Sequence, residues 1–113
     1  MTKGQVKHTV TMTPGAERDL EAIYDYIEAF DSPQNADRVL DQLVKVVESL
    51  ARWPERGNYP RELAWLGIKA FRQVTFKPYR IIYRILDRQV VIYVVADGRR
   101  DLQTVLENRL LTG

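Results

Sequence analysis

Cysteine is absent from the 113-residue chain, and His8 is its only histidine. Without cysteine there can be no disulfide, no thiolate nucleophile and no cysteine-ligated zinc, and the chain suits a reducing compartment, so we expect a cytoplasmic protein. His8 has no second histidine with which to bind a metal ion, so we predict no metal site and interpret His8 as structural. Phosphate-binding, dinucleotide-binding, HExxH and GxSxG motifs are missing as well, and we expect no cofactor.

Long apolar runs are also lacking. The longest, Val90 to Ala96, is far shorter than the roughly 20 residues that span a bilayer, and the polar start, Met1 to Lys7, has no signal-peptide pattern. We therefore expect no membrane contact. With 45% hydrophobic and 28% charged residues, the composition is that of a globule able to bury a core. The length fits one domain of about 100 to 150 residues, which we place at residues 1–113.

Charge is divided unevenly along the chain. Residues 1–60 hold 7 Lys and Arg against 10 Asp and Glu, whereas residues 61–113 hold 10 against 5, which gives −3 and +5 and the net charge of +2. Clustered arginine and lysine raise the local positive potential. The C-terminal half is therefore expected to present a face to an anionic partner, either nucleic acid or an acidic protein segment.

The N-terminal half contains the pattern of a strand followed by two helices. Apolar and polar residues alternate from Val6 to Thr13, which predicts a half-buried strand. Thr13-Pro14 and Ser32-Pro33 each combine a capping hydroxyl with a proline at the first helical position, so each predicts a helix start. Apolar residues follow both starts at three- and four-residue steps, and the second helix is expected to end at Trp53-Pro54. The two helices form a hairpin whose end we expect Trp53 to seal.

The C-terminal half contains three strand-like segments after an irregular loop at Pro54 to Gly67. They are Lys69 to Phe76, Tyr79 to Leu86 and Val90 to Ala96, joined by turns short enough for hairpins. The last is apolar on both faces, which predicts a central strand covered on both sides. Asp101 to Leu111 then has the spacing of a short helix. The predicted class is α+β, with two layers: an antiparallel four-stranded sheet with the N-terminal helical hairpin on one face, in the order β-α-α-β-β-β plus a short C-terminal helix.

Four short stretches carry a resemblance to a known family. They are Thr13 to Leu20 (TPGAERDL), Trp53 to Gly57 (WPERG), Pro78 to Arg84 (PYRIIYR) and Asp97 to Asp101 (DGRRD). In their order and spacing, over nearly the whole chain, they resemble the RelE/ParE toxin superfamily of type II toxin-antitoxin systems. The resemblance implies one of two activities. RelE-like members are mRNA endonucleases that act at the ribosome, and ParE-like members poison DNA gyrase.

Residue-by-residue matching favours the ParE-like branch. Arg80 and Arg100 fall where the ribonucleases keep phosphate-binding arginines, so they are the candidate catalytic residues of the ribonuclease alternative. Leu106, however, stands where those enzymes carry a tyrosine, and Phe71 and Gln73 replace their lysines. Arginine, with a pKa above about 12, makes a poor general base. The set is incomplete, which favours a toxin that is not an enzyme, and no catalytic residue is assigned outside the ribonuclease alternative.

The resemblance also implies partners. They are a ParD-like antitoxin with an acidic C-terminal segment, DNA gyrase as the target, and operator DNA only through the antitoxin. The antitoxin segment would also provide the second cover for the doubly apolar last strand. The alternatives are a RelE-like ribosome-dependent mRNA endonuclease that uses Arg80 and Arg100, and a degenerate toxin that only binds its antitoxin.

Partner binding is predicted on a mixed basic and apolar surface, where arginine and aromatic side chains are favoured as anchors. Two other interpretations stay open. The arginines on the strands also fit a sheet face that is simply solvated. Arg99-Arg100 also fit a turn paired with Asp97 and Asp101. The predicted partner-binding residues are Arg72, Arg80, Ile82, Arg84, Arg99, Arg100 and Trp65.

Overall fold

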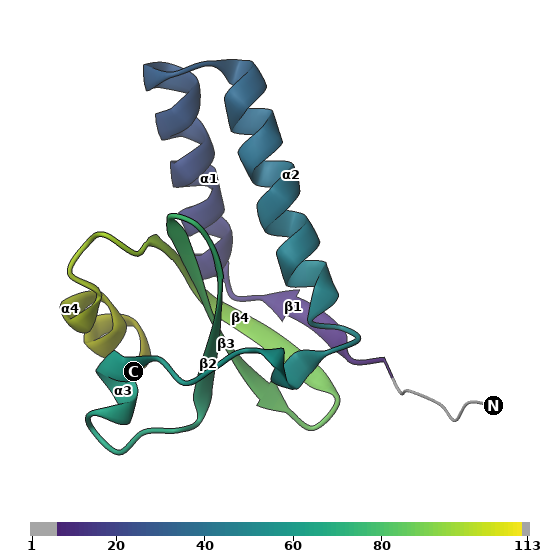
Figure 1. Ribbon diagram of the computed structural model, residues 1–113, viewed down its shortest axis with the longest axis vertical. Helices are drawn as coiled ribbons and strands as arrows, with labels where there is room; N and C mark the ends of the chain where they lie inside the picture. The colour runs from purple at the N-terminus through teal and green to yellow at the C-terminus, as the bar shows by residue number, and fades with distance from the viewer. Residues whose placement is uncertain (1–6, 112–113) are drawn as a thin grey trace.

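A computed structural model describes residues 7–111 and shows a four-stranded sheet with a long helical hairpin standing on one face (Figure 1). The predicted element order is confirmed, with a further short helix, α3, in the loop before the sheet. The elements are β1 (Thr9–Met12), α1 (Pro14–Phe30), α2 (Pro33–Ser49), a 3₁₀ turn (Pro54–Arg56), α3 (Arg61–Ala64), β2 (Phe71–Phe76), β3 (Tyr79–Leu86), β4 (Gln89–Asp97) and α4 (Leu102–Leu106), which a π-helical turn extends through Glu107–Leu111.

Both helices of the hairpin begin at the predicted caps. The Thr13 hydroxyl accepts a hydrogen bond from the Ala16 amide at 3.1 Å, and the Ser32 hydroxyl accepts one from the Asn35 amide at 3.0 Å. These side chains satisfy amides that the first helical turn leaves without a backbone partner. The end of α2 was predicted too late, because the helix stops at Ser49 and single turns carry the chain on to Trp53.

The strand order is β1-β4-β3-β2, so β4 lies inside the sheet as predicted. β2, β3 and β4 form the expected antiparallel meander, but β1 pairs with β4 in parallel, from Thr9 beside Gln89 to Met12 beside Ile92. The prediction of a wholly antiparallel sheet is therefore wrong for β1. Alternating hydrophobicity is the same in either direction, and no local turn joins β1 to β4 to fix their orientation. Of the predicted first strand, Val6 lies outside the described residues.

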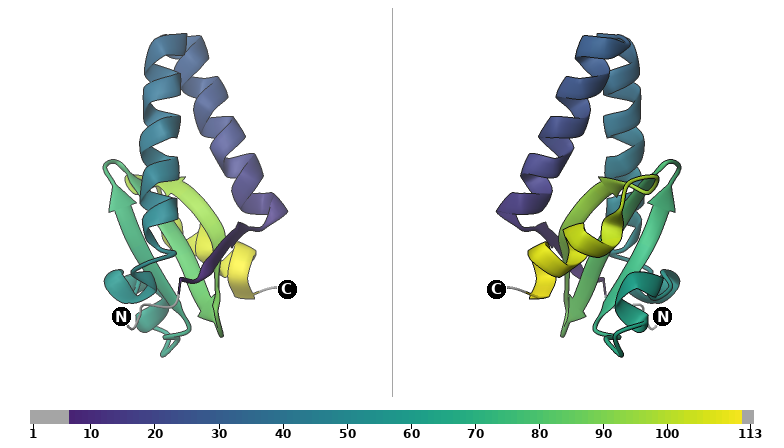
Figure 2. Two further views of the ribbon diagram at one scale, coloured as in Figure 1. Left: turned by 90° about the vertical axis from the view of Figure 1, so that its right-hand side faces the viewer. Right: turned by 90° about the vertical axis from the view of Figure 1, so that its left-hand side faces the viewer.

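Apolar side chains form clusters on both faces of the sheet. On the hairpin side, Ile81 and Tyr83 pack with the helices, and on the other side Ile82 and Val94 pack under α3 and α4. Figure 2 shows α4 and the hairpin on opposite sides of the sheet. The prediction that the last strand is covered on both faces is confirmed. The cover expected from an antitoxin segment is instead supplied by the chain itself, and α3 and α4 add a partial layer to the two that were predicted.

Among residues 7–111, no helix has both the length and the apolar character needed to cross a membrane.

Candidate functional site

Arg80, at the start of β3, is enclosed by polar partners on the α3 side of the sheet. Its Nη1 and Nη2 donate to the two carboxylate oxygens of Glu62 at 2.8 and 2.7 Å, and its Nε donates to Gln73 Oε1 at 2.8 Å. The Arg80 and Glu62 side chains are each only 15% exposed. The hydrogen bond from Arg80 also lowers the pKa of Glu62, so the carboxylate stays ionised beside the guanidinium. Because Glu62 is paired with the guanidinium, the positive charge of Arg80 is already neutralised and is not available to bind a phosphate.

Arg99 and Arg100, two more of the predicted residues, lie in an exposed turn that follows β4. Asp97 accepts hydrogen bonds from the Arg99 amide and Nε, both at 2.9 Å, and from Nη2 at 2.6 Å. The contact with Arg99 lowers the pKa of Asp97. The Arg99 side chain is nevertheless 76% exposed, and Arg100 has no carboxylate partner within 4.0 Å in the described part of the chain. The interpretation as a turn therefore fits Arg99, whereas Arg100 is available to a partner. Asp101 instead caps α4, accepting from the Gln103 amide.

The turn containing Arg99 and Arg100 borders a cavity of about 450 Å³ between α1 and the end of β4. Tyr26 and Tyr79 line the same cavity, and burial raises the pKa of Tyr79, with the Asp97 charge adding to the effect. The guanidinium of Arg80 points instead to α3, although its side-chain stem passes close to Gly98. The guanidinium of Arg80 and the side chain of Arg100 therefore lie on different sides of the sheet. Sequence reasoning missed Tyr26 and Tyr79, because no local pattern places a helix residue beside a strand residue 53 positions later.

The position expected to hold a catalytic tyrosine is part of the core. Leu106 is fully buried beneath the sheet, in the cluster that contains Ile82 and Val94. Phe71 is 7% exposed and meets the ring of Tyr93 edge-on at 5.4 Å, and Gln73 is bound to Arg80. Leu106 and Phe71 therefore belong to the apolar core, whereas Gln73 is a polar partner of Arg80.

The remaining predicted partner residues do not form one surface. Arg72 is on the hairpin side of β2, donates to the Gly57 carbonyl at 3.0 Å and lies over the Tyr59 ring, whereas Arg84 lies on the other side, over the Phe71 ring. Trp65, 86% exposed, is accessible. Ile82 is fully buried in this structure, and its role as a partner contact stays a prediction. This apolar position lies between Arg80 and Arg84 on one face of β3, and it belongs to the core because α4 covers it.

The Trp53–Gly57 stretch has a structural explanation. The Tyr83 hydroxyl donates to the Pro54 carbonyl at 2.6 Å and accepts from the Gly57 amide at 3.1 Å. A Cβ at Gly57 would collide with the Gln73 carbonyl and would lie 2.6 Å from the Tyr83 hydroxyl oxygen. Glycine at this position is therefore required by the close approach of the loop to β2 and β3.

Comparison with known proteins identifies the family. Residues 10–102 match the family described as ParE toxin of type II toxin-antitoxin system, parDE. The chain belongs to the ParE toxin family. It is similar to Toxin RelE2 of Caulobacter vibrioides, with 37% identity over 92 residues that cover 80% of this toxin and 96% of the relative. Its membership of the RelE/ParE superfamily, expected from the four stretches, is confirmed.

Two solved structures share the fold of this toxin. The chromosomal ParDE system of P. aeruginosa aligns with a TM-score of 0.69 and 21% identity, covering 82% of this chain and 98% of that chain. The toxin-antitoxin complex RelBE2 of Mycobacterium tuberculosis aligns with a TM-score of 0.62 and 27% identity, covering 85% and 97%. Both are structures of toxin-antitoxin systems.

Proposed function

We propose that this toxin acts in the cytoplasm in the ParE-like manner: it binds DNA gyrase, traps the complex with cleaved DNA and does no covalent chemistry itself. A cognate ParD-like antitoxin with an acidic C-terminal segment neutralises it, and it contacts operator DNA only through that antitoxin. The observation that carries this proposal is the burial of Leu106 in the core, at the position where the ribonuclease branch keeps a tyrosine.

The chemistry of RNA cleavage supplies the physical argument. Attack by the 2′-hydroxyl requires a base, protonation of the leaving oxygen requires an acid, and the crowded phosphate requires a free cation. Arg80 is the strand arginine that would bind the phosphate, but Glu62 and Gln73 hold it. Moving it to a phosphate would leave the largely buried Glu62 carboxylate without its counter-charge, which is costly.

The runner-up is a RelE-like ribosome-dependent endonuclease. Two observations favour it over a toxin without activity: the similarity to a relative named RelE2, and the cavity in which Arg100 lies near Tyr79. Burial raises the pKa of Tyr79, which makes its phenol a weaker proton donor, so the candidate acid of this alternative is not an activated one. A third candidate is a degenerate toxin that binds only its antitoxin.

One paired experiment separates these functions. Purified toxin is added to a gyrase supercoiling and cleavage assay, and in parallel to a coupled translation reaction followed by primer extension on the message. Cleaved plasmid with an intact message is the expected result. Codon-phased cuts in the message with normal supercoiling would establish the endonuclease instead, and silence in both assays would favour the degenerate toxin. Arg100→Ala is the control for the second arm, because it should abolish message cutting only if Arg100 binds the phosphate.

A further inference from the structure

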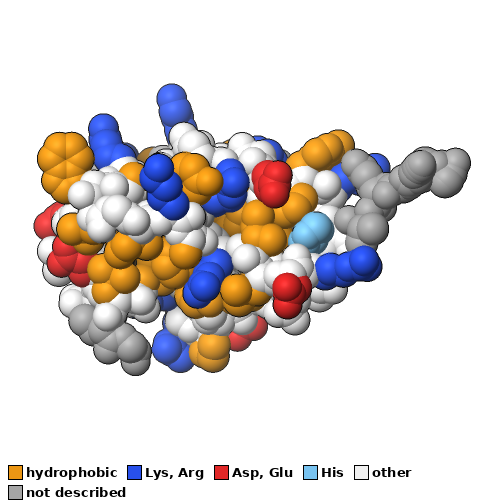
Figure 3. Space-filling model, turned by 90° about the horizontal axis from the view of Figure 1, so that it is seen from below, with side chains coloured by type: hydrophobic (Ala, Val, Ile, Leu, Met, Phe, Trp, Pro, Cys, Tyr) orange, Lys and Arg blue, Asp and Glu red, His pale blue; other side chains and the backbone are white. Residues whose placement is uncertain are grey.

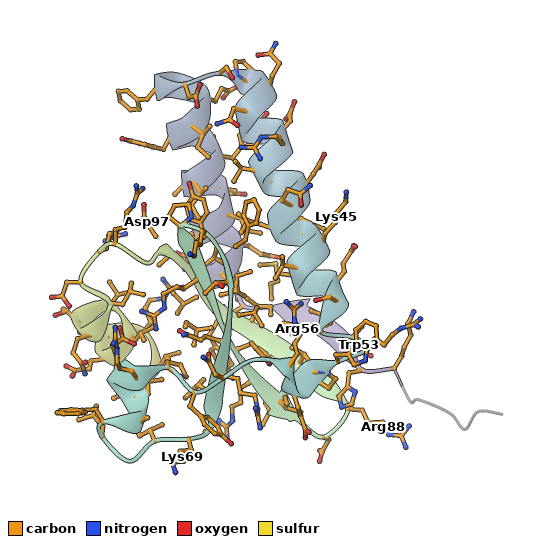
Figure 4. The ribbon with its side chains drawn as sticks, viewed as in Figure 1. Lys45, Trp53, Arg56, Lys69, Arg88 and Asp97 are labelled. Atoms are coloured by element: carbon orange, nitrogen blue, oxygen red, sulfur yellow. The ribbon has the colours of Figure 1, made fainter. Side chains whose placement is uncertain are left out.

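The segment that follows α2 borders an open cavity of about 740 Å³, larger than the one beside Arg100. We call the larger cavity, of about 740 Å³, the Trp53 pocket. Figure 4 shows Trp53 and Arg56 together near the base of α2, far from Asp97. Seen from below, hydrophobic side chains gather beside the single histidine, His8 (Figure 3). The residues of the pocket that matter for binding are His8, Arg52, Trp53, Pro54, Arg56 and Ile85.

Trp53 is the main apolar element of this pocket. Its ring was expected to seal the end of the hairpin, but it is 56% exposed, so that prediction is wrong. Loop contacts explain this position: the Trp53 amide donates to Ser49, and Tyr83 holds the adjacent Pro54 carbonyl, which fixes the backbone outside the core. A large exposed aromatic side chain beside an apolar hollow is typical of the centre of a binding site.

Two arginines on the pocket wall have no acidic partner. The Arg52 guanidinium carbon lies 5.6 Å from the centre of the Trp53 ring, and Arg56 Nη1 hydrogen-bonds to the Ser49 hydroxyl. Neither guanidinium has a carboxylate within 4.0 Å in residues 7–111. Among the described residues, Glu55 provides the one carboxylate that lines the pocket. A guanidinium binds carboxylates through paired hydrogen bonds, so the wall is complementary to an acidic ligand.

His8 supplies a further unsatisfied group in the wall. Its backbone amide donates to the Ala51 carbonyl at 2.8 Å, which holds the residue against the loop after α2. Its Nδ1 atom, however, is buried without a hydrogen-bond partner among the described residues. Buried polar atoms normally have partners. Among residues 7–111, this atom of the pocket wall is therefore left without a hydrogen-bond partner.

We propose that the Trp53 pocket receives an acidic segment of the antitoxin. A large apolar side chain of the segment sits between Trp53 and Ile85, and a neighbouring carboxylate pairs with Arg52 or Arg56. One helical turn provides this spacing, because side chains three or four positions apart lie on one face. The inference rests on the antitoxin partner of the proposed function and assigns it a site. A nucleic acid is disfavoured because the floor of the pocket is largely apolar, which suits an apolar side chain better than a phosphate backbone.

The test measures affinity for the antitoxin encoded by the neighbouring reading frame. Toxin variants are purified and titrated with that antitoxin by calorimetry at two salt concentrations. Trp53→Ala is expected to weaken binding at least 30-fold, because it removes the apolar wall. Arg52→Glu is expected to weaken binding about 10-fold and to reduce its salt dependence. Phe30→Ala and Arg38→Gln, an exposed aromatic and an exposed arginine on the hairpin, are the matched controls and should stay within threefold of wild type.

Each other outcome has a separate meaning. Wild-type affinity of folded Trp53→Ala and Arg52→Glu would overturn the assignment of the pocket while leaving the antitoxin in place. Failure of the wild-type toxin to bind the antitoxin would instead defeat the proposed function. If Trp53→Ala loses structure by circular dichroism, Arg52→Glu decides, because its long side chain is at the surface. Sedimentation of toxin alone as a dimer that Trp53→Ala dissociates, or displacement of the antitoxin by a single-stranded oligonucleotide, would also overturn the proposal.

Discussion

Arg80 and the arginines of the Trp53 pocket have the same charge but opposite surroundings. Arg80 is 15% exposed and is bound by Glu62 and Gln73, whereas Arg52 and Arg56 border an open pocket and form no ion pair within residues 7–111. The first site is closed by α3, and the second is left open by an exposed tryptophan. A basic residue therefore marks a binding site only when the fold leaves its charge unpaired. Local charge in the sequence does not reveal this.

The largest expected effect tests how firmly the α4 side is closed. Leu106→Ala should lower the free energy of unfolding by about 3 kcal/mol, because it leaves a cavity in the cluster under α4. Urea denaturation measures the loss. Leu111→Ala, at a position that is 42% exposed in the following turn, is the control and should cost less than about 1 kcal/mol. Equal costs for the two variants would mean that α4 does not seal the sheet.

A smaller effect is expected from the ion pair that closes the Arg80 site. Glu62→Gln keeps the shape of the side chain but removes the charge beside Arg80, so it should destabilise the toxin by about 2 kcal/mol. Thermal and urea unfolding give the value. Glu55→Gln, in the Trp53 pocket, should change stability by less than about 0.5 kcal/mol because Glu55 has no ion pair among the described residues. A stable Glu62→Gln variant would show that Arg80 does not depend on this partner.

The same pair predicts a dependence on pH. The pKa of Glu62 in the folded state is lowered from its ordinary value of 4.5, mainly by the hydrogen bond from Arg80. Its contribution to stability is therefore complete above the unfolded-state pKa and is lost as pH falls through the folded-state pKa. Unfolding curves taken from pH 6 down to about pH 3 should show a steeper loss of stability for wild type than for Glu62→Gln. Parallel curves would contradict the assignment.

The smallest effect on stability is expected at the exposed turn. Arg99→Ala with Arg100→Ala should leave the unfolding midpoint essentially unchanged, because exposed ion pairs contribute little. If this turn contacts the gyrase target, the double variant should lose most growth inhibition when it is expressed without antitoxin. Arg18→Ala with Arg38→Ala, on the hairpin, is the matched control. Full toxicity of a stable Arg99 and Arg100 variant would remove this turn from the target surface.

Much of the fold could be predicted because its signals are local. Thr13-Pro14 and Ser32-Pro33 start the helices as their capping chemistry requires, and Tyr79–Leu86 is the strand that its pattern predicted. The parallel pairing of β1 could not be predicted, because it depends on the path of the whole chain. The role of α4 was also missed. Its spacing predicted a helix, but nothing local indicated that Leu106 would lie under β3 and β4.

The candidate site was less predictable than the fold. The Arg80 partner, Glu62, lies 18 positions earlier in an irregular loop whose conformation has no periodic signal. The exposure of Trp53 depends on Tyr83, a strand residue that anchors the adjacent loop. Residue type therefore identified arginine and tryptophan as candidates, but long-range contacts decided which of them are free.

The parallel pairing of β1 with β4 has a consequence for how the toxin is made. Thr9 and its partner Gln89 are far apart in the sequence, so the sheet joins residues that are synthesised at different times. Pairing over such a separation requires closure of a long loop and is slow to form. A chain stalled before Gln89 has neither β4 nor α4 and cannot assemble this fold. Toxicity should therefore require that β4 and α4 have both been translated.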